Sequence, residues 1–154
     1  MNTREYLHQH KVPFELVAHA ETYDAPHLAQ AVHTPGREVA KAVLLRVDRG
    51  YRYAVALLPS THRIDLGALS KALGGAEVEL ATEVEIAEHC PDCEFGVLPP
   101  FGSRFGAETI IDAALAADEQ IVFEGDSHTE AIRIKYHDFY DLEHPRVEYF
   151  AARG

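Results

Sequence analysis

Runs of apolar residues, separated by turn residues, divide the chain into short segments of strand and helix character. The apolar runs 39–47 and 51–59 flank the sequence Asp-Arg-Gly at 48–50, which predicts a β-hairpin whose first strand is buried on both faces. Shorter segments rich in β-forming residues predict further strands, namely 14–20, 77–81, 108–116, 120–125 and 130–136.

Helix signals lie between these strands. Thr3, Asp24, Asp65 and Thr82 stand where an N-cap residue is favoured, and Glu85 completes a capping box with Thr82. The predicted helices are 3–10, 25–33, 63–75, 82–90 and 137–142. Because hairpins alternate with single helices, we expect a mixed sheet of about six or seven strands, accompanied by about four or five helices.

Length and composition restrict the fold class further. The chain has 154 residues, of which 47% are apolar, enough for one core and too few for two comfortable domains. We therefore expect a single compact α/β domain over residues 1–154. No run of about 18 apolar residues is present. Residues 1–5 lack the apolar core of a signal peptide, so we expect a cytoplasmic protein without a membrane partner.

Charge limits the kind of partner that the chain can bind. The formal net charge of -11 argues against broad wrapping of a nucleic-acid backbone, which needs many cations against phosphates. A small basic patch in the central third remains able to grip one end of a nucleic acid; its members would be Lys41, Arg46, Arg49, Arg52, Arg63 and Lys71.

The sequence Gly-Val-Leu-Pro-Pro-Phe-Gly at 96–102 predicts a stiff loop. Two adjacent prolines fix φ and remove two N–H groups, which excludes a helix interior or a central strand. The glycines at both ends allow backbone angles that other residues avoid. The apolar residues between them are unusual for a solvated turn, so this loop is either a structural turn or the wall of a pocket.

Two polar residues stand out by position. Lys41 lies inside an apolar strand, where burial of an ammonium costs several kcal/mol unless it is paired. It either reaches to water at the start of the strand or points into a cleft and meets an anion. His128 follows Gly125 between two predicted strands, where a histidine either lines a pocket or belongs to an ordinary turn.

The sequence His-Cys-Pro-Asp-Cys, with His89, Cys90 and Cys93, is the remaining candidate for chemistry. A Cys-x-x-Cys pair is typical of redox sites and of half a zinc site. Here it follows a predicted helix instead of starting one, and the sequence has no second cysteine pair. We therefore expect two partly buried thiols without a catalytic role. Other metal motifs and the nucleotide-binding glycine loops are absent from the sequence.

Three segments together resemble the YbaK/prolyl-tRNA-editing domain family. They are residues 39–73, with an internal lysine, a hairpin, Leu-Pro and Arg-Ile-Asp-Leu; the loop 96–102, similar to that family's Gly-x-x-Pro-Pro-Phe-Gly; and the strand–glycine–strand segment 123–134. The resemblance covers nearly the whole chain in the family's order. It implies a compact α/β fold with a mixed, barrel-like sheet flanked by helices.

The resemblance also implies a free-standing hydrolase that removes a wrong, small amino acid from the acceptor end of tRNA without a metal or other cofactor. Lys41 matches the family's pocket lysine, which meets the phosphate and ribose of the terminal adenosine. Gly96 and Gly102 match the ends of the loop that shapes the aminoacyl pocket, and His128 falls where many members carry a pocket histidine. The expected substrate contacts are Val97, Leu98, Pro99, Pro100, Phe101, Gly125 and Ser127.

In such a site a water held by backbone groups, helped by the ribose hydroxyl of the substrate, attacks the ester, and backbone N–H donors stabilise the developing oxyanion. The strongly negative net charge of -11 points to contact with the acceptor end only, or to help from a synthetase or another carrier. Two alternatives stay open: a binding module of this fold that has lost catalysis, and a thiol or metal protein built on His89, Cys90 and Cys93. The amino acid removed and the tRNA recognised are not specified by the sequence.

Overall fold

The computed structural model describes residues 2–153. The helices in this range are α1 (Thr3–Gln9), α2 (Ala25–Ala31), α3 (Leu66–Ala72), α4 (Glu83–His89), α5 (Ala113–Ala116) and α6 (Tyr136–Glu143). The strands are β1 (Glu15–Ala18), β2 (Ala40–Val47), β3 (Arg52–Pro59), β4 (His62–Ile64), β5 (Val78–Leu80), β6 (Glu108–Asp112), β7 (Gln120–Glu124), β8 (Glu130–Lys135), β9 (Arg146–Glu148) and β10 (Ala151–Arg153). Short 3₁₀ turns are η1 (Gly36–Glu38), η2 (Asp48–Gly50) and η3 (Gly102–Phe105).

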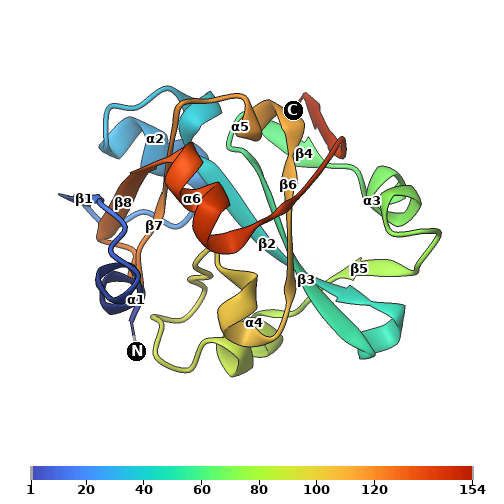
Figure 1. Ribbon diagram of the computed structural model, residues 1–154. Helices are drawn as coiled ribbons and strands as arrows, with labels where there is room; N and C mark the ends of the chain where they lie inside the picture. The colour runs from blue at the N-terminus through green and yellow to red at the C-terminus, as the bar shows by residue number, and fades with distance from the viewer. Residues whose placement is uncertain (1, 154) are drawn as a thin grey trace.

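The strands form three hydrogen-bonded sheets. A five-stranded sheet has the order β5-β2-β3-β6-β9, a three-stranded sheet β1-β8-β7, and a small pair joins β10 to β4. In the largest sheet β3 pairs with β6 in parallel and with β2 in antiparallel fashion, so the predicted mixed sheet is confirmed. The barrel-like closure is not: within residues 2–153 the sheets are separate, and one isolated bridge, Val39 to Val122, links the two larger ones. Figure 1 shows β1, β8 and β7 on one side of the molecule and β5 with α3 on the other.

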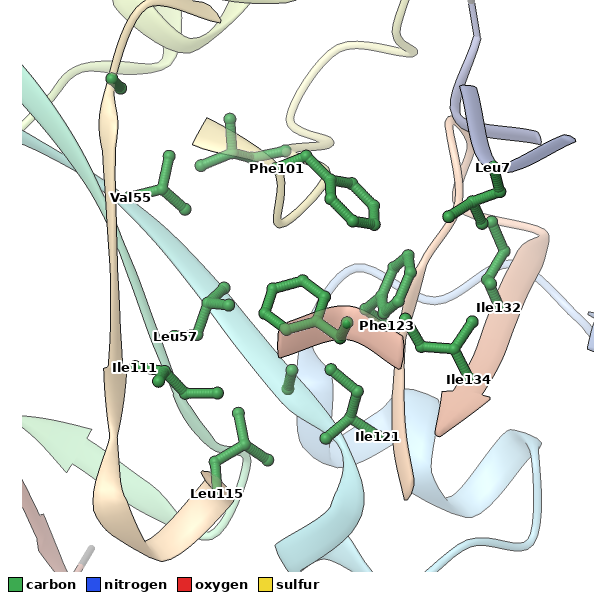
Figure 2. Packing of buried hydrophobic residues seen from close by; sticks show 14 of the residues in the cluster. Leu7, Val55, Leu57, Phe101, Ile111, Leu115, Ile121, Phe123, Ile132 and Ile134 are labelled. Atoms are coloured by element: carbon green, nitrogen blue, oxygen red, sulfur yellow. The ribbon is translucent and has the colours of Figure 1, made fainter. Parts of the chain in front are cut away.

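The main core lies between the two larger sheets. Leu44, Val55, Leu57 and Ile111 come from the five-stranded sheet and meet Ile121, Phe123, Ile132 and Ile134 from the three-stranded one. Figure 2 shows Phe101 between the side chains of the two sheets. A second cluster packs α3 and Phe150 against the opposite face of β2 and β3. The hairpin is therefore buried on both faces, as the continuous apolar pattern predicts.

Most predicted helix starts are confirmed by capping contacts. The side chains of Asp24 and Asp65 each accept an N–H of the first turn, and Thr82 forms the capping box with Glu85. The prediction for Thr3 is wrong, because Asn2 caps α1 through the N–H of Glu5. Thr3 is instead buried, and its amide and hydroxyl groups both donate to the carboxylate of Asp126.

Two further predictions need correction. The segment 108–116 is not one strand: it changes from β6 to α5 at Asp112, whose side chain accepts the N–H of Ala114 at 2.9 Å. Alanine favours helix, so a local cap is enough to end the strand there. The short strands β4, β9 and β10 were not predicted, because three residues carry no recognisable period. No helix within residues 2–153 is long and apolar enough to cross a membrane.

Candidate active site

A small pocket of about 120 Å³ lies where the start of α2, the start of β2, the end of β7 and the loop after Gly96 come together. Its lining residues are Tyr23, Asp24, Ala25, Leu28, Ala40, Lys41, Ala42, Gly96, Leu98, Phe123 and Glu124. Ligand pockets usually enclose about 300–1,000 Å³. This one has room for a small group and not for a whole nucleoside.

Lys41 reaches this pocket from the second position of β2. Lys41 is half-buried, and its Nζ donates a hydrogen bond to the backbone carbonyl of His62 on β4 at 2.9 Å. It is the one hydrogen bond of this ammonium among the described residues, so the other two N–H groups are left for an anionic oxygen. Of the two readings that the sequence allows for Lys41, the cleft position is the one that the structure favours.

Gly96 forms the opposite wall with a backbone conformation in the left-handed region, φ +87°. A side chain would find room there, since an added Cβ would lie 3.6 Å from both Glu83 and His128. The conformation, and not the space, therefore requires glycine. Among the hydrogen bonds within residues 2–153, none uses the amide N–H of Gly96 or of Leu98, so two backbone donors stand at this wall.

His128 lies directly behind Gly96 and is buried. Its Nε2 donates to the carbonyl of Phe95 at 2.9 Å, and its backbone N–H donates to the Glu94 carboxylate at 2.9 Å. The ring of Tyr23 packs on the imidazole with centroids 4.7 Å apart. His128 therefore fixes the two residues that precede Gly96 and does not itself line the pocket.

Glu124 brings a carboxylate into the pocket from the last position of β7. One of its oxygens lies 3.5 Å from the Nδ1 of His128. Burial raises the pKa of Glu124, an effect that His128 partly offsets. For His128, burial disfavours the charged ring, but the bond to Phe95 and the charges of Glu124 and Glu94 outweigh it, so its pKa is also raised.

The rest of the proline loop turns away from the pocket into the core. Val97, Pro99 and Pro100 are buried, and of the loop's side chains only Leu98 lines the pocket. The Phe101 ring packs against Phe123 and Phe139 with centroids 5.6 and 5.4 Å apart. These contacts attach the loop to the core.

Gly102 lies outside the pocket, at the start of η3. Its N–H donates to the Oγ1 of Thr109 at 2.9 Å, and an added Cβ would lie 2.6 Å from that oxygen. Gly125 is buried beside the backbone of Glu130, and the Ser127 hydroxyl pairs with that of Thr129 at 3.2 Å. Neither Gly125 nor Ser127 is part of the pocket lining.

The cysteines do not form the expected pair of free thiols. Cys90 and Cys93 are joined by a disulfide, which closes the turn after α4. Within residues 2–153 no group of three or more His, Cys, Asp or Glu side chains is placed to hold a metal ion. Cys90 and His89 border a different hollow, together with Tyr6 and Arg104.

Two of the six members of the predicted basic patch of the central third, Arg46 and Arg49, are paired with carboxylates. Arg46 pairs with Glu79 and Glu85, each at 3.3 Å, and Arg49 pairs with Glu77 at 3.3 Å. Lys41 is the member of that group that faces the pocket.

Sequence reasoning missed Glu124, Tyr23 and Phe123 as pocket residues. Glu124 had a signal comparable to that of Lys41, namely a charged residue at the end of an apolar strand. Tyr23 is 69% exposed and belongs to no hydrophobic pattern in the sequence that would have predicted a place in the pocket. A larger hollow of about 990 Å³ lies at the opposite end of β7, bordered among others by Arg37, Gln120 and Tyr136, and contains none of the motif residues.

Comparison with known proteins decides the family. A model of the aminoacyl-tRNA editing domain matches residues 19–142, which include Lys41, the loop 96–102 and His128. The chain belongs to the aminoacyl-tRNA editing domain family. The matched range includes every residue that lines the pocket.

Solved structures agree with this editing-domain fold. The chain is similar to the hypothetical protein APE2540, with a TM-score of 0.85 and 15% identity over 97% of this chain and 98% of the other. A candidate trans-editing enzyme for prolyl-tRNA synthetase matches with a TM-score of 0.76 and 21% identity, over 90% of this chain and 87% of that one. The chain is also similar to part of a protein from Marinobacter aquaeolei VT8 described as a candidate signal transduction protein. That match has a TM-score of 0.73 and 19% identity, and it covers 97% of this chain and 30% of the other.

Proposed function

We propose that this editing domain is a trans-editing hydrolase that deacylates mischarged tRNA, cleaving the ester between a small amino acid and the terminal adenosine. The observation that carries the proposal is that Lys41, Gly96 and Leu98 line one small pocket within the matched family region. The volume of about 120 Å³ suits the aminoacyl group alone, which leaves the nucleoside at the pocket mouth.

The proposed reaction is ester hydrolysis. A water molecule attacks the ester carbonyl, the carbonyl oxygen becomes an oxyanion, and the bond to the ribose oxygen then breaks. The products are a free amino acid and a ribose hydroxyl, which takes up the proton that the water releases. The amide N–H groups of Gly96 and Leu98 are the donors that we assign to the oxyanion.

Lys41 is assigned to the phosphate and ribose of the terminal adenosine, where its charge holds the ester in place. His128 is assigned a positioning role, because its Nε2 is engaged by Phe95 and its Nδ1 faces Glu124. No side chain then acts as a strong base, and attack depends on positioning and on the activated ester. With a net charge of -11 we expect contact with the acceptor end only, or delivery of the tRNA by a synthetase in the cytoplasm.

The test is a deacylation panel. Purified protein is incubated with tRNA charged with alanine, serine, cysteine, threonine or proline, in the presence of a metal chelator, and release of the amino acid is followed. We expect turnover of at least one small aminoacyl ester. Folded protein that binds charged tRNA but hydrolyses none of the five would refute the hydrolase and leave a binding module.

A further inference from the structure

Glu124 is a half-buried carboxylate in a place where the sheet is otherwise apolar. It follows Ile121, Val122 and Phe123, all buried, and its side chain is 19% exposed. Removing a carboxylate from water is costly unless an opposite charge or hydrogen bonds compensate. Glu124 is also one of the residues that line the Lys41 pocket.

Among residues 2–153 the Glu124 carboxylate accepts no hydrogen bond of ordinary length, and only a long contact with His128 partly compensates its burial. Its nearest ionisable neighbour is the Nδ1 of His128 at 3.5 Å, which is beyond ordinary hydrogen-bond length. Lys41 lines the same pocket, but its Nζ donates to His62. The other acidic lining residue, Asp24, accepts the backbone N–H of His27 at 2.8 Å and contacts the His27 ring at 2.7 Å.

The pocket is therefore bipolar, with an ammonium on β2 and a carboxylate of unfilled acceptor capacity on β7. An aminoacyl ester of tRNA is bipolar in the same sense: it carries a phosphate on the nucleotide side of the ester and an α-ammonium group on the amino-acid side. An α-ammonium has three N–H donors, and hydrogen bonds between ionised partners are stronger than neutral ones.

We propose that Glu124 binds the α-ammonium group of the substrate and thereby restricts the pocket to aminoacyl esters with a free α-amine. This inference rests on the proposed function for the choice of substrate. It predicts that N-acylated aminoacyl-tRNA, the chemical class that includes formylated and peptidyl esters, is excluded. Acylation removes the positive charge and adds bulk that a pocket of about 120 Å³ has no room for.

A pair of non-hydrolysable probes tests the inference without requiring hydrolysis. The probes are 3′-amino-3′-deoxyadenosine carrying alanine through an amide, with the α-amine either free or acetylated. Affinities are measured by NMR titration for the wild type, Glu124→Gln, Glu124→Asp and the control Glu119→Gln. Glu119 is an exposed carboxylate just before β7 and outside the pocket, so the control removes the same charge elsewhere.

The wild type and Glu119→Gln should prefer the free amine by about tenfold to hundredfold, as expected for a hydrogen bond between charged groups. Glu124→Gln should lower this preference to the part that the bulk of the acetyl group causes, and Glu124→Asp should keep more of it. If a substitution at Glu124 disturbs His128, the affinities for both probes should fall together. The ratio of the two affinities therefore isolates the contact with the amine. If Glu124→Gln fails to fold, the wild-type ratio and Glu124→Asp still decide the matter.

Equal affinity of the wild type for both probes, or binding of neither, overturns the inference. Hydrolysis of N-acetylated and free aminoacyl-tRNA at equal rates would also overturn it while leaving the deacylase intact. An amine-dependent preference for the probes, without hydrolysis of any charged tRNA, would support the role of Glu124 and refute the deacylase.

Discussion

The Nδ1 atom of His128 lies 3.5 Å from a carboxylate oxygen of Glu124, while the Nε2 of the same ring donates to the carbonyl of Phe95. One imidazole thus connects the end of β7 to the loop that begins at Gly96. Because the ring is buried, its position is set by these contacts and not by solvent. The protonation of His128 is therefore coupled to the geometry of the pocket wall.

This coupling predicts a pH dependence of stability. The pKa of His128 is raised in the folded protein, so the folded state binds the proton more tightly than the unfolded state. The resulting stabilisation is complete below the unfolded pKa of about 6.5 and is lost as pH rises through the folded pKa. The raised pKa of Glu124 acts in the same direction at lower pH.

We expect the free energy of unfolding, measured with urea, to decrease from about pH 6 to about pH 8. In His128→Gln the decrease should be smaller, since glutamine can still donate to the Phe95 carbonyl but does not titrate. The difference between the two proteins removes the contribution of the other histidines. Identical slopes would show that His128 is not coupled to folding in this pH range.

Gly96→Ala should impair the pocket more than it impairs the fold. The residue has φ +87°, where a non-glycine residue costs about 1–2 kcal/mol. Relief of that strain moves the carbonyl of Phe95 away from His128 and the Gly96 N–H away from the ester. We expect a modest loss of stability and a loss of most deacylase activity at saturating substrate.

Gly106→Ala is the matched control for this change. Gly106 has φ +73° with nothing within 4 Å of an added Cβ, and it lies outside the pocket. Its substitution should cost a similar amount of stability and leave activity unchanged. If both variants retained full activity, the Gly96 backbone would not be part of the site.

Gly102→Ala should behave in the opposite way. The new Cβ would lie 2.6 Å from the Oγ1 of Thr109 and 2.9 Å from the carbonyl oxygen of Ala107, so the backbone must shift. Overpacking of this kind costs about 1–3 kcal/mol. We expect a lower midpoint of thermal unfolding with normal activity per folded molecule. Loss of activity without loss of stability would restore Gly102 to the catalytic loop.

These cases show how far the sequence predicts the site. The hairpin, the caps of α2, α3 and α4, and the order of the three motif segments follow from local signals, because periodicity and capping are properties of neighbouring residues. The convergence of Lys41, Gly96 and Glu124 depends on contacts between strands far apart in sequence, which no local pattern encodes. The different places of Gly96 and Gly102 were hidden for the same reason, since both are glycines that end one loop.

Lys41→Ala separates the role of this residue in substrate placement from a role in folding. Among the described residues the Nζ makes one hydrogen bond, to the carbonyl of His62, so its removal should lower the free energy of unfolding by no more than about 1.5–3 kcal/mol and leave the protein folded. A charge-assisted contact with a phosphate contributes about 1.5–3 kcal/mol, so we expect at least a tenfold to hundredfold loss in kcat/KM. Lys41→Arg should restore little, because a planar guanidinium does not replace a compact ammonium in a small pocket.

Lys71→Ala is the control for Lys41→Ala, since Lys71 lies exposed in the last turn of α3 and away from the pocket. It removes the same charge and should leave kcat/KM unchanged, which separates the contact of Lys41 from the long-range attraction of any cation for tRNA. Equal losses of kcat/KM in the two variants would show that Lys41 acts only through the long-range attraction of its charge for tRNA. If most of the Lys41→Ala protein is unfolded and the remaining folded fraction keeps normal specific activity, Lys41 is a structural residue. Its main contribution would then be the bond to His62.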